Sequence, residues 1–210
     1  MTNKYYIKQL SDYIYLINDD TMCSTYVVIG YKNALIIDAG IASNKELLLP
    51  LIKKITNLPI KVVITHAHLD HIGHLYEFDN YYIAKEELDN IKDQAIKEKA
   101  IIISDGFMFD LGGISIETYI SKGHTTASTL FIDKDNKIVF SELPVLSPEI
   151  RDTFLKWLSK ALEKKEWKAK TEDGRKYYIH EEKGKRCVVE CTDGCFTMPQ
   201  YTICFEEESQ

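Results

Sequence analysis

The chain has 210 residues, of which 45% are hydrophobic and 28% are charged, so we expect one folded domain of medium size with at most a small extension. The net charge of -6 gives no electrostatic reason to expect nucleic acid or an anionic membrane as a partner. The sequence contains no apolar run long enough to span a bilayer, and residues 1–6 lack the pattern of an export signal. Five cysteines, an odd number, fit a reducing compartment, so we expect a cytoplasmic protein.

The first forty residues predict an antiparallel opening. Short β-like runs cover residues 5–10, 13–17, 24–30 and 34–38, and Tyr31-Lys32-Asn33 is typical of a hairpin turn between the last two. Asp38-Ala39-Gly40 closes the fourth run. Asp38 is either a carboxylate near a site or a simple turn former, and the local pattern favours neither.

A helix and a buried strand follow. Ser43 is a good N-cap with Glu46 as its capping-box partner, and Pro50 should kink the helix or restart it. The helix is expected to end at Leu58-Pro59, before an apolar strand over residues 60–65. A strand, a helix and a strand in succession predict a parallel crossover, and therefore an α/β protein.

The segment Thr65–His71, with the sequence THAHLDH, is the most informative part of the chain. Three histidines and a carboxylate within six residues, at the end of a buried strand, indicate a metal site. His66 and His68 are two residues apart, so they face the same way while the backbone stays extended. Asp70 and His71 are then free to turn toward a neighbouring position.

The next elements are shorter. We expect a short helix after His71, a strand at residues 81–83, and a charged helix over residues 85–100 whose charges form a solvated face. Strands are predicted at residues 106–109, 114–120, 128–132 and 137–140. His124 follows a glycine where one strand gives way to a loop, so it is a plausible third imidazole for the first metal.

The chain changes in character after residue 146. Ser147-Pro148-Glu149 is a strong helix start, and β-like runs follow at residues 175–181, 186–191 and 200–206. We therefore expect a core over residues 1–146 and a C-terminal helix with β-hairpins over residues 147–210, which either completes the core or is appended to it. For the cysteines of this part, packing is favoured over a structural metal site, since the tight Cys-x-x-Cys pair is missing. They are Cys187, Cys191, Cys195 and Cys204.

Residues 5–141 resemble the metallo-β-lactamase fold superfamily, and within it most closely the glyoxalase II-like hydrolases. The motifs that carry the resemblance are Ile36-Ile37-Asp38-Ala39-Gly40, Thr65-His66-Ala67-His68-Leu69-Asp70-His71-Ile72-Gly73, Asp105-Gly106 leading to Leu111-Gly112-Gly113, Gly123-His124-Thr125 with Ser128, and Ile138-Val139-Phe140-Ser141. The resemblance implies an αββα sandwich with the site at one edge of its two sheets. It also implies that His66, His68 and His124 hold a first metal, and that Asp70 and His71 contribute to a second.

The resemblance breaks after Ser141. The family usually has a Gly-Asp pair there, whose aspartate bridges both metals, whereas this chain has Glu142-Leu143. A one-residue offset points a strand side chain to the opposite face, so Glu142 can substitute only if the backbone bends. The remaining candidate for the last histidine ligand is His180, whose surroundings favour a strand instead. We expect one tightly bound zinc, with a second metal weak or absent; iron or manganese is an alternative.

The resemblance implies a metal-dependent hydrolase acting on a small molecule. A zinc-bound water, oriented by Asp70 as the catalytic residue, would attack a thioester, ester, lactone, lactam or phosphoester. One alternative is a mononuclear iron enzyme similar to sulfur dioxygenases. Another is a degenerate, non-catalytic member that only binds metal. Spacing does not reveal the substrate or the oligomeric state.

Overall fold

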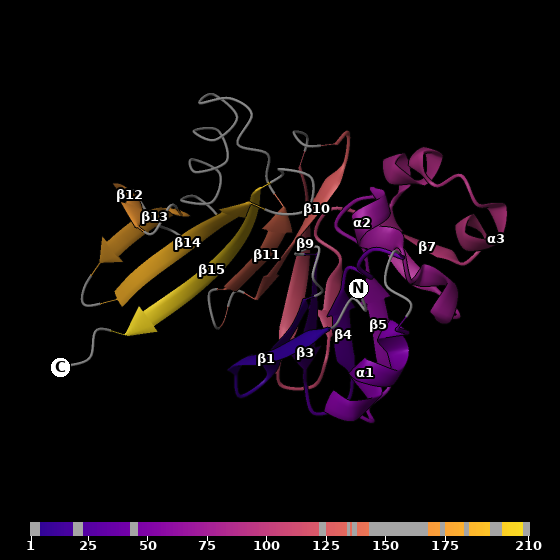
Figure 1. The fold of residues 1–210 in the computed structure, drawn as a ribbon, viewed down its shortest axis with the longest axis horizontal. Helices are drawn as coiled ribbons and strands as arrows, with labels where there is room; N and C mark the ends of the chain where they lie inside the picture. The colour runs from indigo at the N-terminus through magenta and orange to yellow at the C-terminus, as the bar shows by residue number, and fades with distance from the viewer. Residues whose placement is uncertain are drawn as a thin grey trace.

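The structure is a computed structural model, and it shows two β-sheets with short helices on one side (Figure 1). It describes residues 5–18, 23–42, 46–121, 125–133, 135, 138–142, 168–172, 175–182, 185–193 and 199–207. The helix expected from Ser147 and the boundary expected at residue 146 lie outside these residues, so both stay predictions.

The first sheet has seven strands in the order β1-β2-β3-β4-β5-β6-β7. Neighbours are antiparallel from β1 to β4 and parallel from β4 to β7, which confirms the expected antiparallel opening and parallel crossover. The last strand was not expected, although its Ala-Ile-Ile-Ile run has a high strand propensity. The bounds are β1 (Tyr6–Ser11), β2 (Ile14–Asn18), β3 (Ser24–Ile29), β4 (Ala34–Ile37), β5 (Ile60–Val63), β6 (Tyr81–Ala84) and β7 (Ala100–Ile103).

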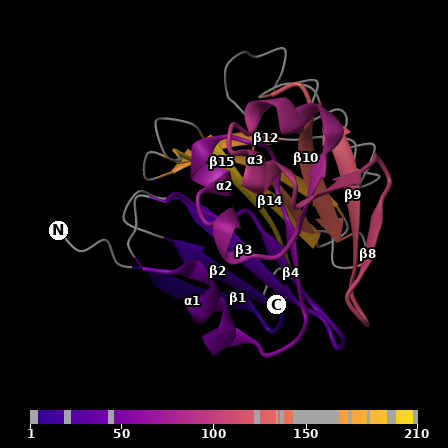
Figure 2. The same ribbon diagram turned by 90° about the vertical axis from the view of Figure 1, so that its right-hand side faces the viewer.

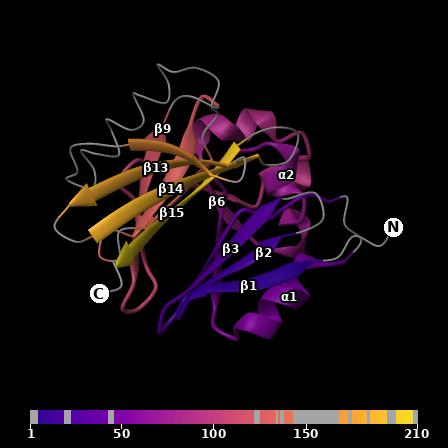
Figure 3. The same cartoon turned by 60° about the vertical axis from the view of Figure 1, so that its left-hand side comes forward.

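The second sheet has eight strands in the order β12-β13-β14-β15-β11-β10-β9-β8, and its paired strands are all antiparallel. The C-terminal strands join this sheet because β15 pairs with β11, and they extend it to one side (Figures 1 and 3). The first of them, β12, was not expected. The bounds are β8 (Met108–Asp110), β9 (Ser115–Ser121), β10 (Ser128–Asp133), β11 (Ile138–Glu142), β12 (Lys168–Glu172), β13 (Arg175–Glu182), β14 (Lys185–Asp193) and β15 (Pro199–Glu207).

The helices of the described part are short and lie on the side seen toward the viewer in Figure 2. The single helix expected over residues 85–100 is wrong, because the chain forms η2, turns extended at Ile91, and starts α3 with Asp93 as its N-cap. No helix in the described part is both long and apolar enough to cross a membrane. The bounds are α1 (Leu48–Ile55), α2 (Leu69–Ile72), η1 (Leu75–Glu77), η2 (Lys85–Asn90) and α3 (Gln94–Lys97).

Helix α1 begins at Leu48, later than its sequence suggests. Its cap comes from elsewhere in the chain: the Glu77 carboxyl accepts hydrogen bonds from Leu48 N at 3.0 Å and Leu49 N at 2.8 Å. Pro50 lies in the first turn, where a missing N–H costs little, so it marks the helix start rather than a kink. A contact between residues 29 positions apart supplies what local capping rules cannot predict.

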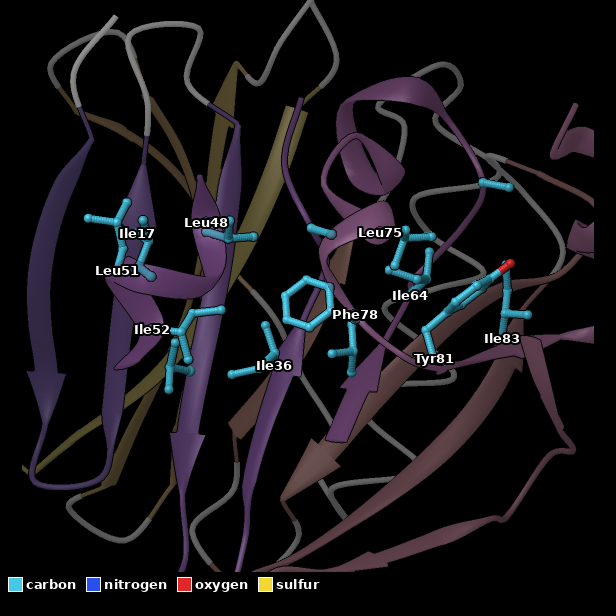
Figure 4. Packing of buried hydrophobic residues seen from close by; sticks show 14 of the residues in the cluster. Ile17, Ile36, Leu48, Leu51, Ile52, Ile64, Leu75, Phe78, Tyr81 and Ile83 are labelled. Carbon is cyan, nitrogen blue, oxygen red and sulfur yellow. The ribbon is translucent and has the colours of Figure 1, made fainter. Parts of the chain in front are cut away.

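Two apolar layers hold the fold together, and β4 contributes to both. Leu35 and Ile37 face the second sheet and pack in a cluster with Phe109 and Phe131. Ile36 faces the helices in a second cluster, whose core is shown in Figure 4. Each fully buried Leu, Ile or Phe contributes about 1.5–3 kcal/mol, so this alternation anchors β4 and its neighbour β5 firmly. The mixed α/β architecture with two packed sheets is as expected.

Cys23 is buried and disulfide-bonded. Disulfides are uncommon in reducing compartments, so the cytoplasmic location inferred from the cysteine content stays a prediction.

Candidate metal centre

The segment Thr65–His71 leaves the first sheet at the end of β5 and is held from both sides. Ile64 N donates to Tyr82 O on one neighbouring strand, at 3.0 Å. On the other side, Thr65 N donates to Asp38 Oδ1 at 2.8 Å. Because hydrogen bonds hold the start of this loop on both sides, its backbone has little conformational freedom. The histidine side chains are therefore attached to a rigid part of the chain.

The three imidazoles of this segment lie against one another. The ring centroid of His66 is 4.5 Å from that of His68 and 4.2 Å from that of His71. His66 and His71 are buried, whereas His68 is exposed. The rings of His66 and His68 are in contact, but only His66 is shielded from solvent, so their expected role as ligands of one metal stays a prediction. The group of imidazoles is therefore accessible to solvent at His68.

Asp38 is the residue that orients this group. Its Oδ2 lies 2.8 Å from His71 Nδ1, and both of its oxygens accept from Thr65 Oγ1, at 2.8 and 2.9 Å. Its backbone is left-handed, with φ of 64°, a conformation that aspartate adopts more readily than most residues. A carboxylate on one imidazole nitrogen fixes which nitrogen carries the proton and leaves the other available to a ligand. Of the two roles expected for Asp38, these contacts with the histidine segment favour the carboxylate near a site over the simple turn former.

Asp70 lies at the start of α2, next to His71. Its Oδ2 is 3.4 Å from His71 Nε2. Partial burial acts to raise the pKa of Asp70, but the hydrogen bond and the charge of His71, followed by a backbone hydrogen bond and the charge of His68, bring the pKa below its usual value. The side chain is therefore an anion at neutral pH and can accept a proton or a hydrogen bond.

The chain that follows His124 approaches the histidine segment. Thr129 N donates to Thr65 O at 2.7 Å, which joins β10 to the end of β5. Thr125 is held against Ser128, with 2.8 Å between their hydroxyl oxygens. His124 itself lies outside the described residues, so its role as the third ligand of the first metal stays a prediction.

The donor set fits a metal ion by its chemistry. Imidazoles and a carboxylate are the ligands that zinc prefers, and the Asp38 contact with His71 is typical of histidines that bind metal. Within the described ranges, no three His, Cys, Asp or Glu side chains stand as a complete metal-binding group. His124, Glu142 and His180 are not among the described side chains, so the full ligand set expected from the sequence stays a prediction.

Another buried histidine, His74, serves a different purpose. Its Nδ1 is 2.6 Å from Glu77 Oε1, and its Nε2 is 3.1 Å from Ile41 O and 2.9 Å from Tyr5 Oη. These contacts join the N-terminal segment, the loop after β4 and the cap of α1. We assign His74 a structural role, because its polar contacts lie within the protein frame.

Sequence reasoning missed Glu87. It lies in the charged stretch that was expected to be a solvated face, but it is fully buried. No periodic signal marks it, since Glu86 beside it is exposed and has the same chemistry. Only the tertiary structure distinguishes the two.

Comparisons with known proteins agree with this arrangement. A family model described as the metallo-beta-lactamase superfamily matches residues 18–141, which is more than half of the chain. A second model, described as a protein of unknown function (DUF2397), matches residues 123–202. The human protein named acyl-coenzyme A thioesterase MBLAC2 is 28% identical over 113 residues, and its Bos taurus counterpart is 27% identical. The chain matches only 40% of the length of these curated relatives.

Solved structures show the same fold at low identity. A metallo-beta-lactamase from Pontibacter korlensis has a TM-score of 0.56 at 19% identity, covering 76% of this chain and 84% of that one. The subclass B3 metallo-beta-lactamase BJP-1 of Bradyrhizobium japonicum has a TM-score of 0.55 at 19% identity, with 74% of each chain covered. The archaeal superfamily protein ST1585 from Sulfolobus tokodaii has a TM-score of 0.52 at 18% identity, covering 68% and 71%. The resemblance to the glyoxalase II-like branch stays a prediction. The chain belongs to the metallo-beta-lactamase superfamily, whose members are mostly hydrolases.

Proposed function

We propose that this chain is a metal-dependent hydrolase of thioesters. The observation that carries the proposal is the packed group of three imidazoles at the end of β5, with Asp38 Oδ2 2.8 Å from Nδ1 of His71. Such a group has no evident use in packing, because apolar side chains would fill the same space without a desolvation cost. The group lies at the C-terminal end of an interior strand, beside the partly buried carboxylate of Asp70, and this position suits a reaction centre.

The first metal would be held by His66, His68 and His124, with Asp70 and His71 available to a second. When bound, zinc supplies Lewis-acid polarisation of a carbonyl and lowers the pKa of a water to about 7. The rest of the chemistry falls to the chain itself. Asp38 holds a proton on Nδ1 of His71, and Asp70 accepts a hydrogen bond from the attacking water and orients it.

Two observations support a thioester as the substrate. The human relative is named an acyl-coenzyme A thioesterase, and the matched region is 113 residues long. In addition, Leu69 lies 76% exposed between His68 and Asp70, where an acyl group beside the imidazoles would contact it. The other candidates are esters, lactones, lactams and phosphoesters, which share the same attack by water.

The test measures metal content and hydrolysis together. The protein is loaded with zinc, and thiol release from acyl-coenzyme A thioesters of several chain lengths is followed with a chromogenic thiol reagent. We expect turnover that chelation abolishes and zinc restores. His66→Ala should lose both metal and turnover, whereas Glu86→Gln, which changes an exposed side chain, should retain both. A zinc-loaded protein that releases no thiol from any of these thioesters would refute the proposal.

A further inference from the structure

Glu87 is a buried carboxyl at the centre of the site's framework. It lies in η2, directly after β6, with none of its surface exposed. Its Oε2 accepts from Ala67 N at 3.1 Å and from Asn90 Nδ2 at 3.3 Å. Its Oε1 accepts from Ala127 N at 3.1 Å. One side chain thus bonds to backbone from two segments that are 60 residues apart in the numbering.

Those two segments carry the histidines that we propose as ligands of the first metal. Ala67 stands between His66 and His68, and Ala127 is three residues after His124. The Glu87 carboxyl therefore joins the histidine segment after β5 to the loop before β10. A second, shorter link runs parallel to it, from Thr129 N to the carbonyl of residue 65, at 2.7 Å.

The chemistry of these bonds requires a carboxyl at this position. The partners of Glu87 are all N–H donors, so each of its oxygens must accept. An amide of the same size has one accepting end and one donating end, and it would turn its NH₂ toward one of the two backbone N–H groups. Burying a polar group without its hydrogen-bond partner is unfavourable. Hence Gln cannot hold both segments at once, although it fills the same volume.

We propose that Glu87 is a positioning residue that holds the two histidine-bearing segments in one register and thereby raises the affinity of the first metal site. The proposal rests on the proposed function for its metal part, while the coupling of the segments can be measured without metal. Residues that orient metal ligands without binding the metal themselves typically raise the metal affinity about 10–100-fold. We expect an effect of this size for Glu87.

The experiment compares Glu87→Gln with two matched controls. Glu77→Gln changes another buried carboxyl that accepts from backbone N–H groups, those of Leu48 and Leu49 at the start of α1. Asn90→Ala removes the side-chain donor to Glu87 and leaves both backbone bonds intact. Glu87→Asp, which is one methylene shorter, replaces Glu87→Gln where the latter does not fold. The readouts are hydrogen exchange by mass spectrometry on the metal-free protein, and zinc affinity by competition with a chromophoric chelator.

We expect Glu87→Gln to speed exchange in peptides covering residues 64–70 and 125–131 together, and to weaken zinc binding about 10–100-fold. Glu77→Gln should speed exchange near the start of α1 and around its other partner, His74, but not in residues 125–131. Asn90→Ala should leave both segments and the zinc affinity unchanged. Unchanged exchange in either segment, or an effect on zinc no larger than that of Glu77→Gln, would overturn the inference. If the unchanged protein binds no zinc, the proposed function fails, and the exchange comparison still decides whether Glu87 couples the segments.

Discussion

Asp38 Oδ2 lies 2.8 Å from His71 Nδ1, although the two residues are 33 positions apart in the chain. Asp38 directly follows β4 and His71 lies in α2, so the contact joins the two ends of the parallel crossover, beyond the C-terminal ends of β4 and β5. The same carboxylate accepts from the backbone and the hydroxyl of Thr65, the residue that opens the histidine segment. One side chain thus determines where the segment starts and how its last imidazole is turned.

Asp38→Asn tests this contact. Asparagine tolerates the left-handed backbone at this position, but it must present its NH₂ either to Thr65 N or to His71 Nδ1. We expect the free energy of unfolding to fall by about 1–3 kcal/mol, measured by urea denaturation of the metal-free protein. Asp79→Asn, at an exposed position, is the control. A loss no larger than that of the control would show that Asp38 does not hold the segment.

Gly73→Ala tests the close approach of the histidine segment to the loop after β4. A Cβ at this position would lie 2.2 Å from Ala42 N and 2.7 Å from Gly40 O. Both are backbone atoms that cannot move aside easily, so we expect a loss of stability of about 1–3 kcal/mol from overpacking. Gly106→Ala is a useful comparison, because a Cβ there meets nothing within 4 Å and the cost comes only from its positive φ of 74°. Equal thermal stability of Gly73→Ala and the unchanged protein would contradict the expected clash.

Tyr81→Phe tests a buried hydroxyl that has no hydrogen-bond partner among the described residues. Its removal should leave stability at neutral pH unchanged or higher, because no hydrogen bond is lost. Burial raises the pKa of Tyr81 to about 12, from 10.0, so the folded state disfavours its ionisation. The unfolded chain ionises first as the pH rises above 10, and the unchanged protein should therefore lose stability there relative to Tyr81→Phe. The difference should reach about 1.4 kcal/mol at pH 11, measured by urea unfolding between pH 8 and 11. A constant difference across this range would contradict the burial of an uncharged hydroxyl.

Metal stoichiometry tests the incomplete second site. The strand β11 ends at Glu142, where the family's bridging aspartate would come one residue later. Two cations about 4 Å apart repel strongly when no carboxylate bridges them. We therefore expect one equivalent of zinc to remain after dialysis, measured by elemental analysis. Two retained equivalents would show that another residue, such as Glu142 or His180, completes the second site.

Local sequence patterns were sufficient to predict much of the fold. Most strands of both sheets follow from alternating or continuous apolar runs bounded by turns. Successive side chains of a strand point to opposite faces of the sheet, so the sequence pattern shows directly which faces are buried. Strands β7 and β12 were not expected, and two helices differ from their expected bounds. Helix α1 starts where Glu77 caps it, and the expected helix over residues 85–100 divides at Ile91, where the backbone becomes extended.

By itself, the sequence determined which side chains are available for chemistry: three histidines and Asp70 within one short segment, at the end of a buried strand. The tertiary structure decided which carboxylates support them. Asp38 approaches His71 from 33 residues away, and Glu87 reaches Ala67 and Ala127 from 20 and 40 residues away. Such contacts depend on the order of strands in the sheet and on the approach of the second sheet. A buried Glu87 and an exposed Glu86 are therefore indistinguishable until the chain is folded.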